Sequence, residues 1–153
     1  MTLNIAINFF KSLNRQAQKK SELKIYKEFI DILSDLENKG LFDKEIQSIE
    51  AVLSNLELTS NTENNKKHFK RKLNKFKKYL KEEFSFITKG YYATLGISLG
   101  MCFGIPIGTT VFGTESGVSL GILFGMFIGF IIGRYKDAEA EKENRVLNTS
   151  SLI

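Results

Sequence analysis

The amino-acid sequence predicts an all-α protein, in which an N-terminal cytoplasmic helical region is followed by a two-helix transmembrane hairpin with glycine zippers. Three observations support this prediction. Of the 12 glycines, 11 lie between Gly90 and Gly133. Between Lys89 and Arg134 the only charged residue is Glu115. In front of that segment, apolar residues recur every three or four positions, as they do on one face of amphipathic helices.

Residues 1–58 form the N-terminal helical region. Ser21 is a suitable start for a helix, Gly40 fits its end, and Asp43 can cap a further helix. Residues 59–65 are rich in Thr, Ser and Asn, which predicts a linker. Helices this short bury little core alone, so we expect them to pack on the next helix or on copies of themselves.

Residues 66–89 read as a basic amphipathic helix beside the membrane, with six apolar residues on one side: Phe69, Leu73, Phe76, Leu80, Phe84 and Ile87. The segment carries 10 basic and 2 acidic residues. We expect its cations to contact anionic lipid, which attracts lysine near the cytoplasmic leaflet. One alternative is that these cations form a solvated face of the helix. Nucleic-acid binding is the less favoured alternative, because no feature of the sequence indicates base-specific contacts. The expected lipid contacts are Lys66, Lys67, Lys70, Arg71, Lys72, Lys75, Lys77, Lys78 and Lys81.

Residues 90–135 have the composition of a transmembrane hairpin with spans at 91–112 and 116–135. The first span has 22 uncharged residues, and at about 1.5 Å per residue this length covers the roughly 30 Å hydrocarbon core. Basic residues flank both outer ends but are missing from the loop, which predicts the cytoplasmic (inner) membrane with both termini cytoplasmic. Residues 136–153 would form a cytoplasmic tail. The alternative is a helical hairpin buried in a soluble assembly.

Glycines repeat every four residues in both spans. Such spacing leaves a strip without side chains on each helix, which allows close approach of the two backbones in lipid. We therefore predict helix packing through Gly96, Gly100, Gly104, Gly108, Gly117, Gly121, Gly125, Gly129 and Gly133.

A second small-residue face lies on the first span, about 200° around the helix from the glycines. It comprises Thr94, Ser98, Cys102 and Thr110, with Pro106 in the same register. We expect this face to meet a neighbouring protomer or a water-filled lumen, which favours a homo-oligomer with the second span toward lipid. The alternative is that the hydroxyls bond back to carbonyls of their own helix.

A resemblance supports the hairpin. The stretch from Lys89-Gly-Tyr-Tyr through the glycine runs to Gly-Arg-Tyr-Lys-Asp-Ala-Glu-Ala-Glu-Lys-Glu-Asn-Arg-Val-Leu147 resembles uncharacterised bacterial glycine-zipper family membrane proteins. The resemblance implies a packing mode but no substrate or catalytic residue. Glycine-zipper outer-membrane lipoproteins are similar only in the repeat, since we find no signal sequence or lipidation cysteine here.

No motif for catalysis is present. His68 is the only histidine, Cys102 is the only cysteine, and no nucleotide loop or metal-spaced cluster occurs. We expect neither an enzyme nor a metal or cofactor site. The favoured function is an oligomeric two-span integral membrane protein that forms or regulates a pore. The alternative is a membrane-anchored adaptor whose cytoplasmic helical region binds a protein partner.

Overall fold

The computed structural model describes residues 1–58 and 65–149, without the side chains of residues 65, 114 and 115. The predicted linker before residue 65 and the last four residues of the predicted tail lie outside this description. The described chain has six helices and two strands of two residues each. An all-α fold class is thereby confirmed. The chain divides into an N-terminal unit, residues 1–87 with 147–153, and a second unit, residues 88–146.

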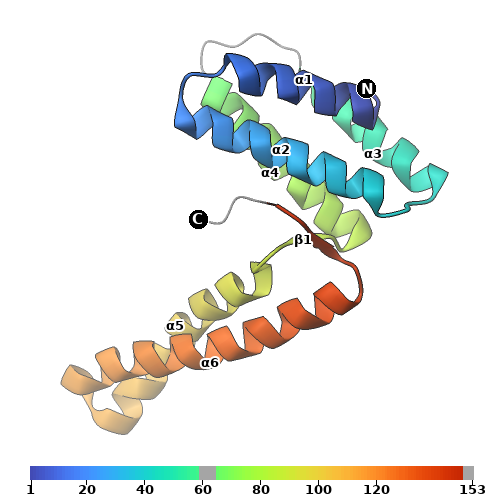
Figure 1. Cartoon of the computed structure of the whole chain (residues 1–153). Helices are drawn as coiled ribbons and strands as arrows, with labels where there is room; N and C mark the ends of the chain where they lie inside the picture. The colour runs from blue at the N-terminus through green and yellow to red at the C-terminus, as the bar shows by residue number, and fades with distance from the viewer. Residues whose placement is uncertain (59–64, 150–153) are drawn as a thin grey trace. The chain divides into compact units, whose positions relative to one another are not determined.

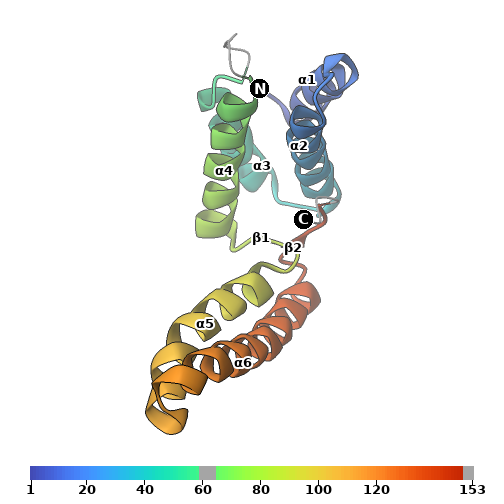
Figure 2. The same cartoon turned by 90° about the vertical axis from the view of Figure 1, so that its left-hand side faces the viewer.

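The N-terminal unit contains α1 (Leu3–Gln16), α2 (Lys20–Asn38), α3 (Asp43–Asn55) and α4 (Asn65–Phe84). Helix α1 runs antiparallel beside α2 (Figure 1), and Figure 2 shows the same pair from the side. Helix α2 also contacts α4. Of the two packings expected for the front helices, the structure has the one on the basic helix for α2, and Phe10 of α1 also contacts Phe69 of α4.

Local signals explain where these helices begin and end. The Thr2 side chain accepts a hydrogen bond from the Ile5 N–H at the start of α1. Helix α2 ends before Gly40, whose φ of 66° is in the left-handed region. The prediction that Asp43 caps α3 is wrong, because Phe42 occupies the N-cap position and Asp43 is the first helical residue. The Phe42 N–H donates to the Glu45 carboxylate at 2.9 Å.

Aromatic side chains join three helices in the core of the N-terminal unit. The Phe10 ring of α1 stacks on Phe29 of α2, with centroids 4.1 Å apart. Phe29 in turn stacks on Phe76 of α4 at 6.4 Å. Burial raises the pKa of the Tyr26 phenol above its usual value, and the charge of Glu22 raises it further. The phenol is therefore neutral at physiological pH, which suits its place in an apolar core.

The basic helix is shorter than predicted. The apolar period of residues 66–89 continues to Ile87, but α4 ends at Phe84 and Ile87 lies in β1 (Ile87–Thr88). Ser85 takes a φ of 56°, and its N–H donates to the Lys81 carbonyl, which is a common helix-ending arrangement. The buried Phe86 side chain then joins the core. The periodicity identified the buried side of this segment but not the break in its backbone.

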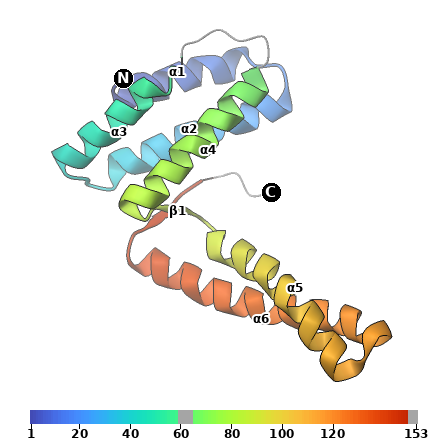
Figure 3. The same ribbon diagram turned by 180° about the vertical axis from the view of Figure 1, so that it is seen from behind.

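The second unit is a helical hairpin of α5 (Tyr91–Phe112) and α6 (Thr114–Lys142), which lie side by side in opposite directions (Figure 3). The first span has its predicted bounds. The loop left between the predicted spans, residues 113–115, is too long, because only Gly113 separates the helices, with a φ of 81°. Helix α6 also passes the predicted end at residue 135, since the Asp-Ala-Glu-Ala-Glu-Lys sequence consists mainly of good helix formers.

The predicted cytoplasmic tail, residues 136–153, is not a simple tail. Helix α6 ends at Lys142, where Asn144 has a φ of 55° and the Arg145 N–H donates to the Ala140 carbonyl. Strand β2 (Val146–Leu147) then pairs with β1. Leu147 is only 1% exposed and belongs to the core of the N-terminal unit. Asn148 donates hydrogen bonds to Asp35 of α2.

We predict that Leu147→Ala destabilises the N-terminal unit by about 2–5 kcal/mol, the cost of truncating a buried leucine. Hydrogen exchange of α2 peptides, measured by mass spectrometry, reports the opening of this unit. Ile5→Ala is the matched control, since Ile5 is 58% exposed. Equal protection of α2 in the two variants would contradict the placement of Leu147 in this core.

Candidate functional site

Along their glycine runs, α5 and α6 meet through backbone atoms. A Cβ added to Gly100 would lie 2.0 Å from the carbonyl oxygen of Gly125, and one added to Gly104 would lie 2.1 Å from that of Gly121. No Cβ atom tolerates such a distance. We call this surface the glycine contact; its residues are Gly96, Gly100, Gly104, Gly108, Gly117, Gly121, Gly125, Gly129 and Gly133.

The contacts within the glycine contact are reciprocal along the hairpin. A Cβ on Gly125 would meet the Gly100 carbonyl oxygen at 2.1 Å, just as one on Gly100 meets Gly125. Each Cα hydrogen therefore points at a carbonyl oxygen of the other helix, the geometry of weak Cα–H···O bonds worth about 0.5–1 kcal/mol each. These contacts and the close dispersion contact offset the low helix propensity of glycine, about 1 kcal/mol per residue.

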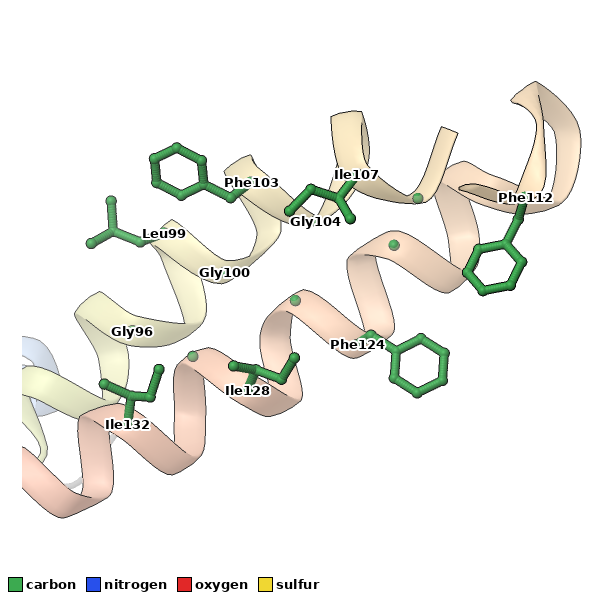
Figure 4. Close-up of a pocket in the computed structure, with 14 residues that line it drawn as sticks. Gly96, Leu99, Gly100, Phe103, Gly104, Ile107, Phe112, Phe124, Ile128 and Ile132 are labelled. Carbon is green, nitrogen blue, oxygen red and sulfur yellow. The ribbon is translucent and has the colours of Figure 1, made fainter. Parts of the chain in front are cut away.

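An open apolar groove of about 680 Å³ runs along one side of the hairpin. Figure 4 shows glycines along its floor and large side chains along its two edges. The edges come from Leu99, Phe103, Ile107 and Phe112 of α5 and from Phe124, Ile128 and Ile132 of α6. Both helices are long and apolar enough to cross a membrane, and little of either apolar stretch is buried.

The second small-residue face of α5 is exposed and internally hydrogen-bonded. Thr94 donates to the Gly90 carbonyl at 2.9 Å, Ser98 to the Thr94 carbonyl at 3.0 Å, and Thr110 to the Pro106 carbonyl at 2.7 Å. The back-bonding alternative therefore describes these three hydroxyls. Because their donors are satisfied within α5, the face can meet an apolar surface without leaving a hydroxyl proton unpaired. Cys102 is a free, exposed thiol on the same face.

Asp137 caps the start of α5 from the other helix. Its two carboxylate oxygens accept hydrogen bonds from the N–H groups of Tyr92 and Ala93, at 2.9 and 3.0 Å. The N-cap residue of α5 is Gly90, which has no side chain to supply these bonds. Helix periodicity did not predict this role of Asp137. The available signal was an uncapped helix start at one end of the hairpin and a lone aspartate just beyond the second glycine run.

The nine cations predicted to contact lipid are all at least partly exposed. The apolar side of α4, in contrast, is buried in the core of the N-terminal unit. Lys77 pairs with Glu28 of α2, and Lys78 pairs with Glu82 at 3.6 Å. Three of the nine, Lys66, Lys70 and Lys77, line a common pocket with residues of α2.

No cluster of three or more histidine, cysteine, aspartate or glutamate side chains with metal-binding geometry occurs in the described residues. Comparisons with protein-family models, with curated proteins and with solved structures give no match for this chain. The resemblance to bacterial glycine-zipper proteins therefore stays a prediction from the residues that carry it.

We predict that Gly104→Ala separates the two helices by about 1 Å or more, because carbon–oxygen contacts need more room than the 2.1 Å available. Spin labels at positions 99 and 128, in a Cys102→Ser background, measure the change as a longer interspin distance. Ser98→Ala serves as control, since Ser98 is exposed on the opposite face. An unchanged distance in Gly104→Ala would contradict the glycine contact.

We also predict that Asp137→Ala frays the first turn of α5. Loss of a capping carboxylate costs about 0.5–2 kcal/mol, so the amides of Tyr92 and Ala93 should exchange roughly 2- to 30-fold faster. Amide exchange followed by NMR in micelles resolves these two positions. Glu141→Ala removes an exposed carboxylate from the same helix and should leave both rates unchanged.

Proposed function

We propose that this chain is an integral membrane protein of the cytoplasmic membrane, in which α5 and α6 span the bilayer as a glycine-zipper hairpin. One observation carries the proposal. Among the described residues, every exposed large hydrophobic side chain except Ile5 and Phe42 lies in α5 or α6. Water would solvate such a surface poorly, whereas lipid would solvate it well.

The orientation follows from the charges at the two ends of the hairpin. Gly133 approaches Tyr92 and Ala93, so Lys89 and Arg134 belong to the same end. The opposite end, around Gly113, carries no basic residue. Because lysine and arginine accumulate on the cytoplasmic side, both chain termini are assigned to the cytoplasm.

The oligomer of the proposal assembles through the Thr94, Ser98, Cys102 and Thr110 face. The glycine contact is occupied within the hairpin, which leaves this face as the other small-residue surface of α5. Its hydroxyl donors are already satisfied, which supports close packing against a second hairpin. In this proposal the oligomer forms or regulates a pore, with the cytoplasmic helices controlling its assembly or opening.

The structure of the N-terminal unit favours a second candidate, a membrane-anchored adaptor. Four helices give this unit a core of its own, and Phe42 is 79% exposed at the start of α3. An exposed aromatic residue on a compact cytoplasmic unit is a reasonable anchor for a protein partner. In this candidate the hairpin only attaches the unit to the membrane.

We predict that the wild-type chain in nanodiscs has the mass of a defined oligomer and that Ser98→Leu with Cys102→Leu reduces it to a monomer. Leucine on this face would block close approach of a second hairpin. Light scattering measures the mass. Ser119→Leu is the control, because Ser119 is an exposed serine of α6. A monomeric wild type would remove the oligomer and leave the adaptor.

Labelling of Cys102 in the wild-type oligomer separates a pore from a closed assembly. A water-filled lumen exposes the thiol to a membrane-impermeant, polar maleimide, whereas packed protomers or lipid protect it. If the oligomer forms a pore, we expect the maleimide to label Cys102 at a rate within about tenfold of its rate in the detergent-denatured chain. Complete protection would contradict a water-filled lumen at this face.

A further inference from the structure

A pocket of about 350 Å³ lies between α2 and α4 in the N-terminal unit. Four lysines contribute to its lining: Lys24 from α2 and Lys66, Lys70 and Lys77 from α4. The α4 lysines fall on one side of the helix, since Lys70 is four residues from Lys66 and Lys77 is seven further on. The pocket is therefore lined by lysines from both helices.

The pocket has an excess of positive charge. Its one carboxylate, Glu28, pairs with Lys77. Four lysines and one glutamate leave a formal charge of +3 on the lining. Among the described residues, no carboxylate forms an ion pair with Lys24, Lys66 or Lys70. An anion in the pocket would supply the negative charge that these three ammonium groups lack as ion-pair partners among the described residues.

Two neutral groups add hydrogen-bonding capacity. Ser21 and Asn74 line the same pocket, and their hydroxyl and carboxamide can both donate to an anion. Ser21 lies in the first turn of α2, whose N-cap residue Lys19 makes no side-chain cap hydrogen bond. The positive end of the α2 dipole therefore adds to the field of the lysines.

We infer that this pocket binds a phosphate-bearing anion. Phosphate carries enough negative charge to neutralise several lysines, and lysine binds it as a point charge. The pocket volume lies at the lower end of the range for small-molecule sites and suits one or two phosphate groups with a small attached group. The anion is either a soluble phosphorylated compound or a lipid headgroup with a terminal phosphate. This inference does not rest on the membrane assembly proposed above.

The test uses the full chain in nanodiscs of phosphatidylcholine, titrated with inorganic pyrophosphate in a calorimeter. We expect saturable binding that Lys24→Gln with Lys70→Gln weakens at least tenfold. Lys75→Gln with Lys78→Gln removes the same charge from exposed positions of α4 that do not line the pocket. This control should weaken binding less than threefold. Far-ultraviolet circular dichroism verifies that both double variants keep their helices.

A second arm identifies the source of the phosphate. Nanodiscs with phosphatidic acid, which has a terminal phosphate, are compared with phosphatidylglycerol nanodiscs of equal surface charge. Weaker pyrophosphate binding with phosphatidic acid alone indicates a headgroup ligand, and equal binding in both indicates a soluble one. Absence of saturable pyrophosphate binding, or an equal loss in the two double variants, would overturn the inference. Tighter binding of single-stranded DNA, equally reduced in both variants, would also overturn it.

Discussion

The backbone-to-backbone approach at the glycine contact is the constraint on which the hairpin depends. Once the carbonyl oxygen of one helix occupies the place of a Cβ on the other, every large side chain of α5 and α6 must point sideways or outward. The apolar groove and the exposed apolar surface both follow from this. A hairpin packed through leucine would bury its large side chains between the helices; this one leaves them for its surroundings.

The same close approach explains why a capping residue can act across the hairpin. Gly133 approaches Tyr92 and Ala93, which brings the next turn of α6 to the start of α5. Asp137 reaches the free N–H groups there. A wider helix pair would place that carboxylate out of reach, so the cap and the glycine contact support one another.

Periodicity predicted the helices but not the points where the backbone leaves them. The spacing from Phe69 to Leu80 correctly marked the side of α4 that is buried. It could not show that Ser85 takes a left-handed conformation, because no glycine marks the position and the apolar phase continues to Ile87. Asp137 was missed for a different reason. Its role depends on a residue 45 positions away, and helix periodicity carries no information on contacts of that range.

The placement of Leu147 has a consequence for biosynthesis. A chain emerges from the ribosome from its N-terminus, and domains generally fold as they emerge. The N-terminal unit of this protein cannot complete its core in that way, because one of its buried side chains, Leu147, follows α5 and α6 in the sequence. Helices α1 to α4 must therefore wait, with part of their apolar surface uncovered, until both apolar helices have been translated. The core of the unit therefore closes only after the whole hairpin has been synthesised.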